Sequence, residues 1–106
     1  MPEESILVLS TFPDADSARR AAETLVEERL AACVSILPQI ESIYRWKGAI
    51  EKSSEVLALI KTNSWKYQPL EARIRQLHPY EVPEIISLRI DSGSVDYLRW
   101  IDESVL

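Results

Sequence analysis

The sequence predicts an α+β fold whose elements follow one another as β-α-β-β-α-β-α. Two observations carry this prediction: two segments have helical apolar spacing and lie between strand-like runs, and a long hairpin joins the two halves. Two βαβ-like halves joined in this way give the split βαβ, or ferredoxin-like, arrangement. Its sheet is antiparallel and both main helices lie on one face. A chain of 106 residues suits a single domain, spanning 1–106.

The first half begins with a mostly apolar run at 6–11, which predicts a short strand buried on both faces. Pro13 ends the strand, and Asp14 or Asp16 can cap a following helix. In that helix apolar residues recur at the spacing of one helical face, which is typical of an amphipathic helix of about fifteen residues. These positions are Ala18, Ala21, Ala22, Leu25, Val26 and Leu30.

The middle of the chain predicts a long hairpin. A strand at 32–37 meets Pro38, which implies an edge strand or a bulge, and the strand resumes at 40–47. We expect a turn between Gly48 and Ser54 and a third strand at 55–62. This hairpin is longer than the core of such a small domain needs. Because its outer part carries Tyr44 and Trp46, we expect it to contact another chain.

The second half predicts a helix, a strand and a last helix. Asn63 or Ser64 caps the first of these helices, the strand runs over 84–90, and both helices have a regular apolar face. Their apolar positions are Tyr67, Leu70, Ile74 and Leu77, then Val95, Leu98, Ile101 and Val105. With both main helices on one side, the other face of the sheet is bare. Either the last helix or a neighbouring subunit must cover it, which predicts a homo-oligomer.

Composition excludes several classes of protein. The net charge of −5 argues against a nucleic-acid-binding domain, and a single cysteine excludes an internal disulfide. No apolar run approaches the roughly 18 residues of a membrane span. The acidic start at 1–4 does not resemble a signal peptide, so we expect a cytoplasmic protein. With glycines only at Gly48 and Gly93, no phosphate-binding loop of the Walker or dinucleotide type can be written.

The main candidate for chemistry surrounds His78, the only histidine. Pro79 and Pro83 stiffen the segment that follows it, and that segment carries Glu81 and Glu84. Imidazole with carboxylate suits Cu(II) or another divalent metal, so His78, Glu81 and Glu84 are candidate ligands. The alternative is that His78 caps the preceding helix and Glu81 is a solvated acid. Neither a nucleophile motif nor an oxyanion site is visible, so we do not expect an enzyme.

Several uncommon strings resemble the CutA family, also called the divalent-cation tolerance proteins. They are LAACVSI at 30–36, SIYRWKG at 42–48, EVL at 55–57, KT at 61–62, HPYEVPEI at 78–85 and DYLRW at 96–100. The resemblance implies a compact homotrimer similar to the PII signalling proteins, with hairpins paired between subunits. It also implies a link to tolerance of copper and other divalent metals. His78 stands at the family's characteristic histidine. Some members have a proposed copper-binding cysteine where this chain has Ser10, and Cys33 matches a different family cysteine.

Two hypotheses about function follow. In the first, the protein is a non-enzymatic, trimeric, cytoplasmic protein of divalent-cation tolerance that binds copper through His78. In the second, it is a PII-like regulatory module that binds a small ligand, including an anionic one, in clefts between subunits. Tyr44, Trp46, Lys61 and Tyr80 would then contact the ligand. Neither hypothesis includes nucleic acid or a membrane as a partner.

Overall fold

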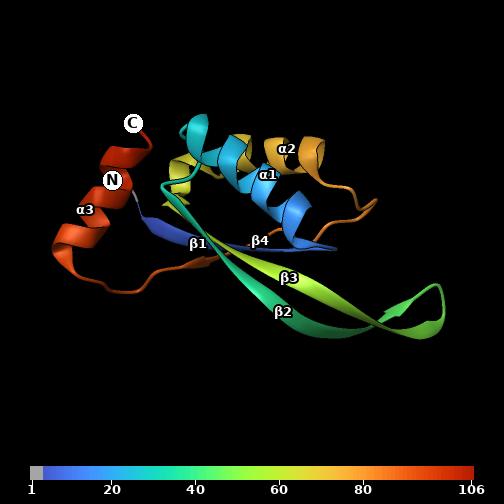
Figure 1. The fold of residues 1–106 in the computed structure, drawn as a ribbon. Coiled ribbons are helices and arrows are strands. Elements are labelled where there is room, and N and C mark those ends of the chain that lie inside the picture. Colours follow the sequence, from blue (N-terminus) through green and yellow to red (C-terminus); the bar gives the residue numbers. More distant parts are fainter. Residues whose placement is uncertain (1–3) are drawn as a thin grey trace.

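The computed structural model describes residues 4–106 and confirms the predicted α+β fold (Figure 1). Its one sheet has the strand order β2-β3-β1-β4. Strand β1 pairs antiparallel with both β3 and β4, and β2 pairs antiparallel with β3. The elements are β1 (Ser5–Phe12), α1 (Ala15–Glu27), β2 (Cys33–Trp46), β3 (Ala49–Asn63), a 3-10 turn (Ser64–Lys66), α2 (Tyr67–Leu77), β4 (Ile86–Arg89) and α3 (Val95–Ser104).

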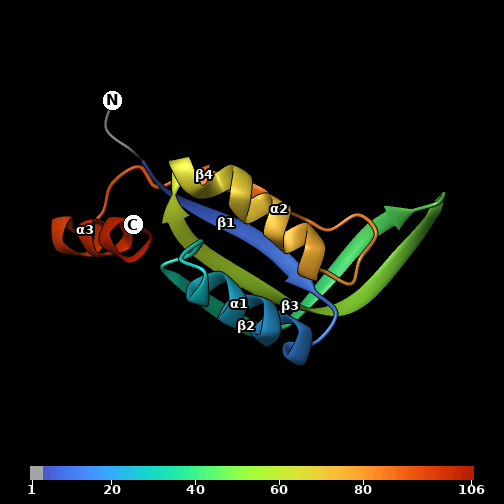
Figure 2. The same ribbon diagram turned by 90° about the horizontal axis from the view of Figure 1, so that it is seen from above.

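Helices α1 and α2 lie side by side on one face of the sheet (Figure 2). Asp14 caps α1, since its Oδ1 accepts a hydrogen bond of 2.7 Å from the backbone N–H of Ser17. The small side chains of Ala18 and Ala21 face the sheet and are fully buried, which lets the helix approach closely. The main core lies between the helices and the sheet, and its largest members are Val8, Phe12, Leu25, Ile60, Leu70 and Ile74.

The hairpin of β2 and β3 extends well beyond the region that the helices cover (Figure 1). Its register shifts between Leu37 and Ile40, which confirms the irregularity expected at Pro38. The position predicted for the turn, between Gly48 and Ser54, is wrong. The turn consists of Lys47 and Gly48, which have φ angles of 50° and 83°, so β3 begins at Ala49. A two-residue turn is favoured here because positive φ at both positions matches the twist of the paired strands.

The opposite face of the sheet is mostly apolar, and within residues 4–106 no helix lies over its centre. Residues paired directly across an antiparallel ladder point to the same face. The large apolar side chains on the uncovered face are therefore Leu7, Leu9, Leu37, Leu57, Leu59, Ile86 and Leu88. Three of them are strongly exposed, at 44% for Leu37, 50% for Ile86 and 48% for Leu88. We call these seven residues the open sheet face.

Helix α3 lies beyond one end of the sheet in both views (Figures 1 and 2). It packs through a separate small cluster of Ala32, Leu98, Ile101 and Val105. The side-chain amide of Asn63 donates a 2.6 Å hydrogen bond to Asp102 and fixes the helix to β3. The last helix therefore does not cover the centre of the open sheet face. Within residues 4–106, no helix is long and apolar enough to cross a membrane.

Ser10 lies on the helix side of β1, fully buried, and its hydroxyl has no hydrogen-bond partner among the described residues. A buried hydroxyl without a partner is destabilising. We therefore expect Ser10→Ala to raise the free energy of unfolding by about 1 kcal/mol in urea denaturation. Thr62→Val provides the contrast, because the Thr62 hydroxyl donates a 2.8 Å bond to the carbonyl of Leu30. It should lower stability by about 1 kcal/mol. A loss of stability in Ser10→Ala would contradict the prediction.

Candidate functional site

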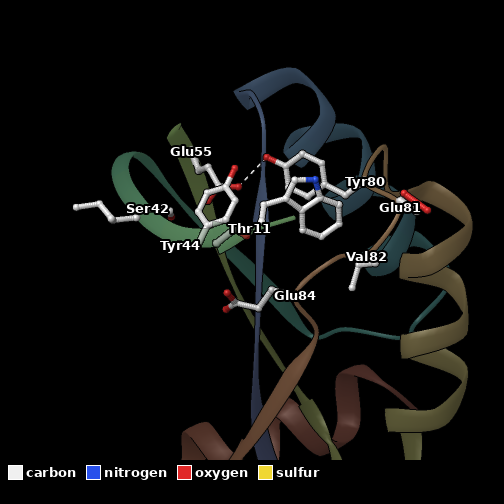
Figure 3. A pocket seen from close by; sticks show the side chains of 10 residues that line it. Thr11, Ser42, Tyr44, Glu55, Tyr80, Glu81, Val82 and Glu84 are labelled. Atoms are coloured by element: carbon white, nitrogen blue, oxygen red, sulfur yellow. Dashed lines mark hydrogen bonds between the residues drawn. The ribbon is translucent and has the colours of Figure 1, made fainter. Parts of the chain in front are cut away.

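A pocket of about 510 Å³ opens between the outer part of the hairpin and the loop that follows α2 (Figure 3). Its size is that of a small-molecule site. Five residues that the sequence predicts to bind a metal ion or a small ligand line this pocket together: Tyr44, Trp46, Tyr80, Glu81 and Glu84. The other lining residues are Thr11, Ser42, Ile43, Glu55 and Val82. The structure thus joins parts of the two predicted sites, the acids of one and the aromatic residues of the other, in a single pocket.

The local sequence explains how these side chains come together. Ser42, Tyr44 and Trp46 alternate along β2, so they project from one face of the hairpin. The loop opposite carries Tyr80, Glu81 and Glu84. This loop contains no helix or strand, but its prolines at 79 and 83 restrict the backbone and so fix the direction of these side chains.

Glu55 is the most buried charged residue of the pocket, at 7% exposure. The phenol of Tyr80 donates a 2.6 Å hydrogen bond to Glu55 Oε2 (Figure 3). Burial and this carboxylate raise the pKa of Tyr80 far above its usual range, so Tyr80 stays a neutral donor. Sequence reasoning did not single out Glu55, an acid at the start of the predicted strand 55–62. The available signal was its place next to the apolar run that begins at Val56.

His78 lies behind the pocket and does not line it. The ring is 8% exposed and stacks on Phe12 with the centroids 4.3 Å apart. Nε2 lies 2.8 Å from the carbonyl oxygen of Thr11, which can only accept, so this nitrogen carries the proton. Nδ1 accepts a 3.1 Å bond from the backbone N–H of Tyr80. In this arrangement both ring nitrogens are occupied, and the imidazole holds Tyr80 in place.

The neutral state of His78 follows from these contacts. Burial lowers the pKa of His78, and the contacts with the Thr11 carbonyl and the Glu55 charge oppose this only in part. The residue also ends α2, where its backbone N–H bonds the carbonyl of Ile74 at 2.8 Å. In the described part of the chain, no three side chains of His, Cys, Asp or Glu come close enough to hold a metal ion. The predicted trio of His78, Glu81 and Glu84 is therefore not assembled within one chain.

Lys61 lies outside the pocket, on the part of β3 that contacts α3. Its ammonium donates a 3.0 Å hydrogen bond to the phenol of Tyr97 and lies 5.3 Å from the centre of that ring. The hydrogen bond raises the pKa of Lys61. Within one chain, Lys61 helps to hold α3 and does not meet the other predicted cleft residues.

Comparison with known proteins gives a consistent assignment. The family described as CutA1 divalent ion tolerance protein matches residues 6–104. A divalent-cation tolerance protein CutA from Thermus thermophilus is 48% identical over 98 residues, which cover 92% of this chain and 95% of that protein. The human Protein CutA is 50% identical over 91 residues, 86% of this chain, but this match covers only 51% of its own length.

Solved structures agree with the sequence comparison. CutA from Xylella fastidiosa superposes with a TM-score of 0.94 at 43% identity, covering 96% of this chain and 98% of that one. A protein from Archaeoglobus fulgidus described as a periplasmic divalent cation tolerance protein CutA gives 0.93 at 35% identity, covering 96% and 99%. The fold, the match over nearly the whole chain and the identity to curated relatives place this chain in the CutA family of divalent-ion tolerance proteins.

Proposed function

We propose that this protein acts in divalent-cation tolerance as a cytoplasmic homotrimer, built from one domain per chain, and that it does not act as an enzyme. Membership in the CutA family supports the link to divalent cations. The observation that carries the trimer is the open sheet face, an apolar surface beside a hairpin that extends past the core.

The surface chemistry supports assembly in detail. Beyond the open sheet face, the outer part of the hairpin exposes Ile43 and Ile50 at 60% each. Extended apolar surface of this kind is typical of obligate interfaces. Light scattering at micromolar concentration should give three times the 12.1 kDa mass of one chain. A mass of 12.1 kDa would overturn the trimer proposal.

The cytoplasmic location is supported by the cysteine content. Cys33 is the only cysteine of the chain, which therefore cannot form the internal disulfides that are common in exported proteins. Fractionation of cells that express the tagged full-length protein would test this. Recovery in a periplasmic, secreted or membrane fraction would contradict it.

A divalent cation, with Cu(II) first, is the ligand that the family assignment suggests. Glu81 and Glu84 offer carboxylate oxygens at the pocket, and ligands from a second subunit would have to complete the site. His78 could take part only if Nδ1 released the Tyr80 amide.

Calorimetric titration of the trimer with Cu(II) tests this proposal. The double variant Glu81→Gln/Glu84→Gln should bind more weakly than the native protein. The double variant Glu23→Gln/Glu27→Gln removes the same charge from α1 and should bind as the native protein does. If all three proteins bind Cu(II) with equal affinity, Glu81 and Glu84 are not metal ligands.

A second candidate function is a PII-like regulatory module that binds a small molecule. The observation that favours it is the pocket itself, in which Tyr44, Trp46 and Tyr80 meet a buried carboxylate in a volume of about 510 Å³. A thermal-shift screen of metabolites tests it, because a ligand that binds the folded state raises its midpoint. The shift should be lost in Trp46→Ala. A ligand whose shift survives that substitution binds elsewhere and would count against the pocket.

A further inference from the structure

Glu55 has a buried carboxyl group that forms no ion pair in the described part of the chain. Its side chain belongs to a residue with only 7% exposure, and its one hydrogen bond comes from the neutral phenol of Tyr80. The ion pairs of the described residues involve other acids: Asp16, Glu28, Glu71 and Glu4. Burying a carboxylate without a cationic partner is costly, so the site is suited to a positive charge supplied from outside.

The rest of the pocket has the same electrostatic character. Glu81 and Glu84 add two carboxylates to the lining, and among residues 4–106 of one chain no lysine, arginine or histidine contributes to it. His78 behind the wall is neutral at pH 7 because burial lowers its pKa. Lys47 lies close to the pocket residue Trp46, with its ammonium 5.8 Å from the centre of that ring, but Lys47 does not line the pocket. A pocket walled by acids attracts cations and repels anions.

The aromatic residues narrow the class of cation. Tyr44, Trp46 and Tyr80 line the same volume as the acids, and Tyr44 and Tyr80 flank Glu55 (Figure 3). Aromatic faces attract ammonium groups and also bury apolar groups. A bare metal ion would leave most of the volume unused, and within residues 4–106 the acids do not converge closely enough to share one.

We propose that the pocket binds a small organic cation, in which an ammonium group pairs with Glu55 and an apolar body lies against Tyr44, Trp46 and Tyr80. This inference rests on the second candidate function, the binding of a small molecule in this pocket. It names the class of that molecule. Within one chain, the acids of the pocket favour a cation over the anionic ligand that a cleft containing Lys61 would have favoured.

Three probes of one shape and different charge test the proposal: benzylammonium, benzyl alcohol and benzoate. Binding to the native, full-length protein is measured by calorimetry at pH 7 and 0.15 M salt. Benzylammonium should bind at least about tenfold more tightly than benzyl alcohol, since one ion pair with cation–π contact is worth this much. Benzoate should bind more weakly than benzyl alcohol. Raising the salt concentration should weaken the binding of benzylammonium more than the binding of benzyl alcohol.

Two variants assign the effect to the pocket. Glu55→Gln keeps an acceptor for Tyr80 and should bring the ratio of the two affinities close to one. Glu27→Gln removes the same charge from the far side of the fold and should leave the ratio unchanged. If Glu55→Gln does not fold, Tyr44→Leu at a 43% exposed position replaces it and should weaken benzylammonium binding.

The outcomes separate the two proposals. Equal binding of the cation and the alcohol, with both lost in Trp46→Ala, would overturn the cation inference and leave small-molecule binding in place. Tighter binding of benzoate would overturn it in the same way. If none of the probes binds and no metabolite shifts the melting midpoint, both the inference and the second candidate function fail.

Discussion

Leu88→Asp is expected to convert the trimer into monomers of 12.1 kDa. Leu88 lies on β4 opposite Leu7 and belongs to the open sheet face. Its side chain is 48% exposed in the single chain, so a subunit that covers this face would bury it. Burying leucine contributes about 1.5–3 kcal/mol, and a desolvated carboxylate costs several kcal/mol in each subunit. Three such changes in one assembly should exceed what the remaining contacts can offset.

The matched control is Ser87→Asp on the same strand. Ser87 pairs with Val8, so its exposed side chain points to the helix side of the sheet. The control introduces the same charge one residue away and should leave the trimer intact. Light scattering and circular dichroism on all three proteins separate loss of assembly from loss of folding. A folded Leu88→Asp protein that remained trimeric at micromolar concentration would show that the open sheet face is not the interface.

The parts of this fold that depend on local patterns could be predicted from the sequence. The apolar spacing of α1 and the cap at Asp14 needed only neighbouring residues, and so did the irregularity at Pro38. The turn at Lys47 could not be placed in the same way. A lysine with a positive φ angle is unusual, and only the paired strands on both sides of it enforce that conformation.

In the site, too, local sequence patterns could be predicted and contacts between distant segments could not. The loop with Tyr80 and Glu84 stood out because prolines and acids follow one another there. The environment of Glu55 depends on Tyr80, which lies 25 positions away, and that of His78 on Thr11, 67 positions away. No pattern within one segment carries those contacts. They follow from the register of β1 with β3 and from where α2 ends.

His78→Ala is expected to lower the free energy of unfolding by roughly 3 kcal/mol. The substitution removes two hydrogen bonds, worth about 1 kcal/mol each, and the stack on Phe12, worth about 1 kcal/mol. Val82→Ala in the same loop is the control, since that side chain is 69% exposed and should change stability by less than about 0.5 kcal/mol. Urea denaturation of both variants gives the comparison. A His78→Ala protein as stable as the native one would contradict the positioning role of the imidazole.

The same contacts predict how stability changes with pH. Burial lowers the pKa of His78 in the folded protein below the 6.5 of a free imidazole. Below pH 6.5 the unfolded chain therefore binds a proton that the folded chain does not, and stability falls as the pH decreases toward the lowered pKa. Above pH 6.5 both states are neutral and this contribution is constant. His78 is the only histidine, so the slope should disappear in His78→Gln. Urea midpoints that fall in parallel between pH 7.5 and about 5.5 for both proteins would show that His78 is not held neutral.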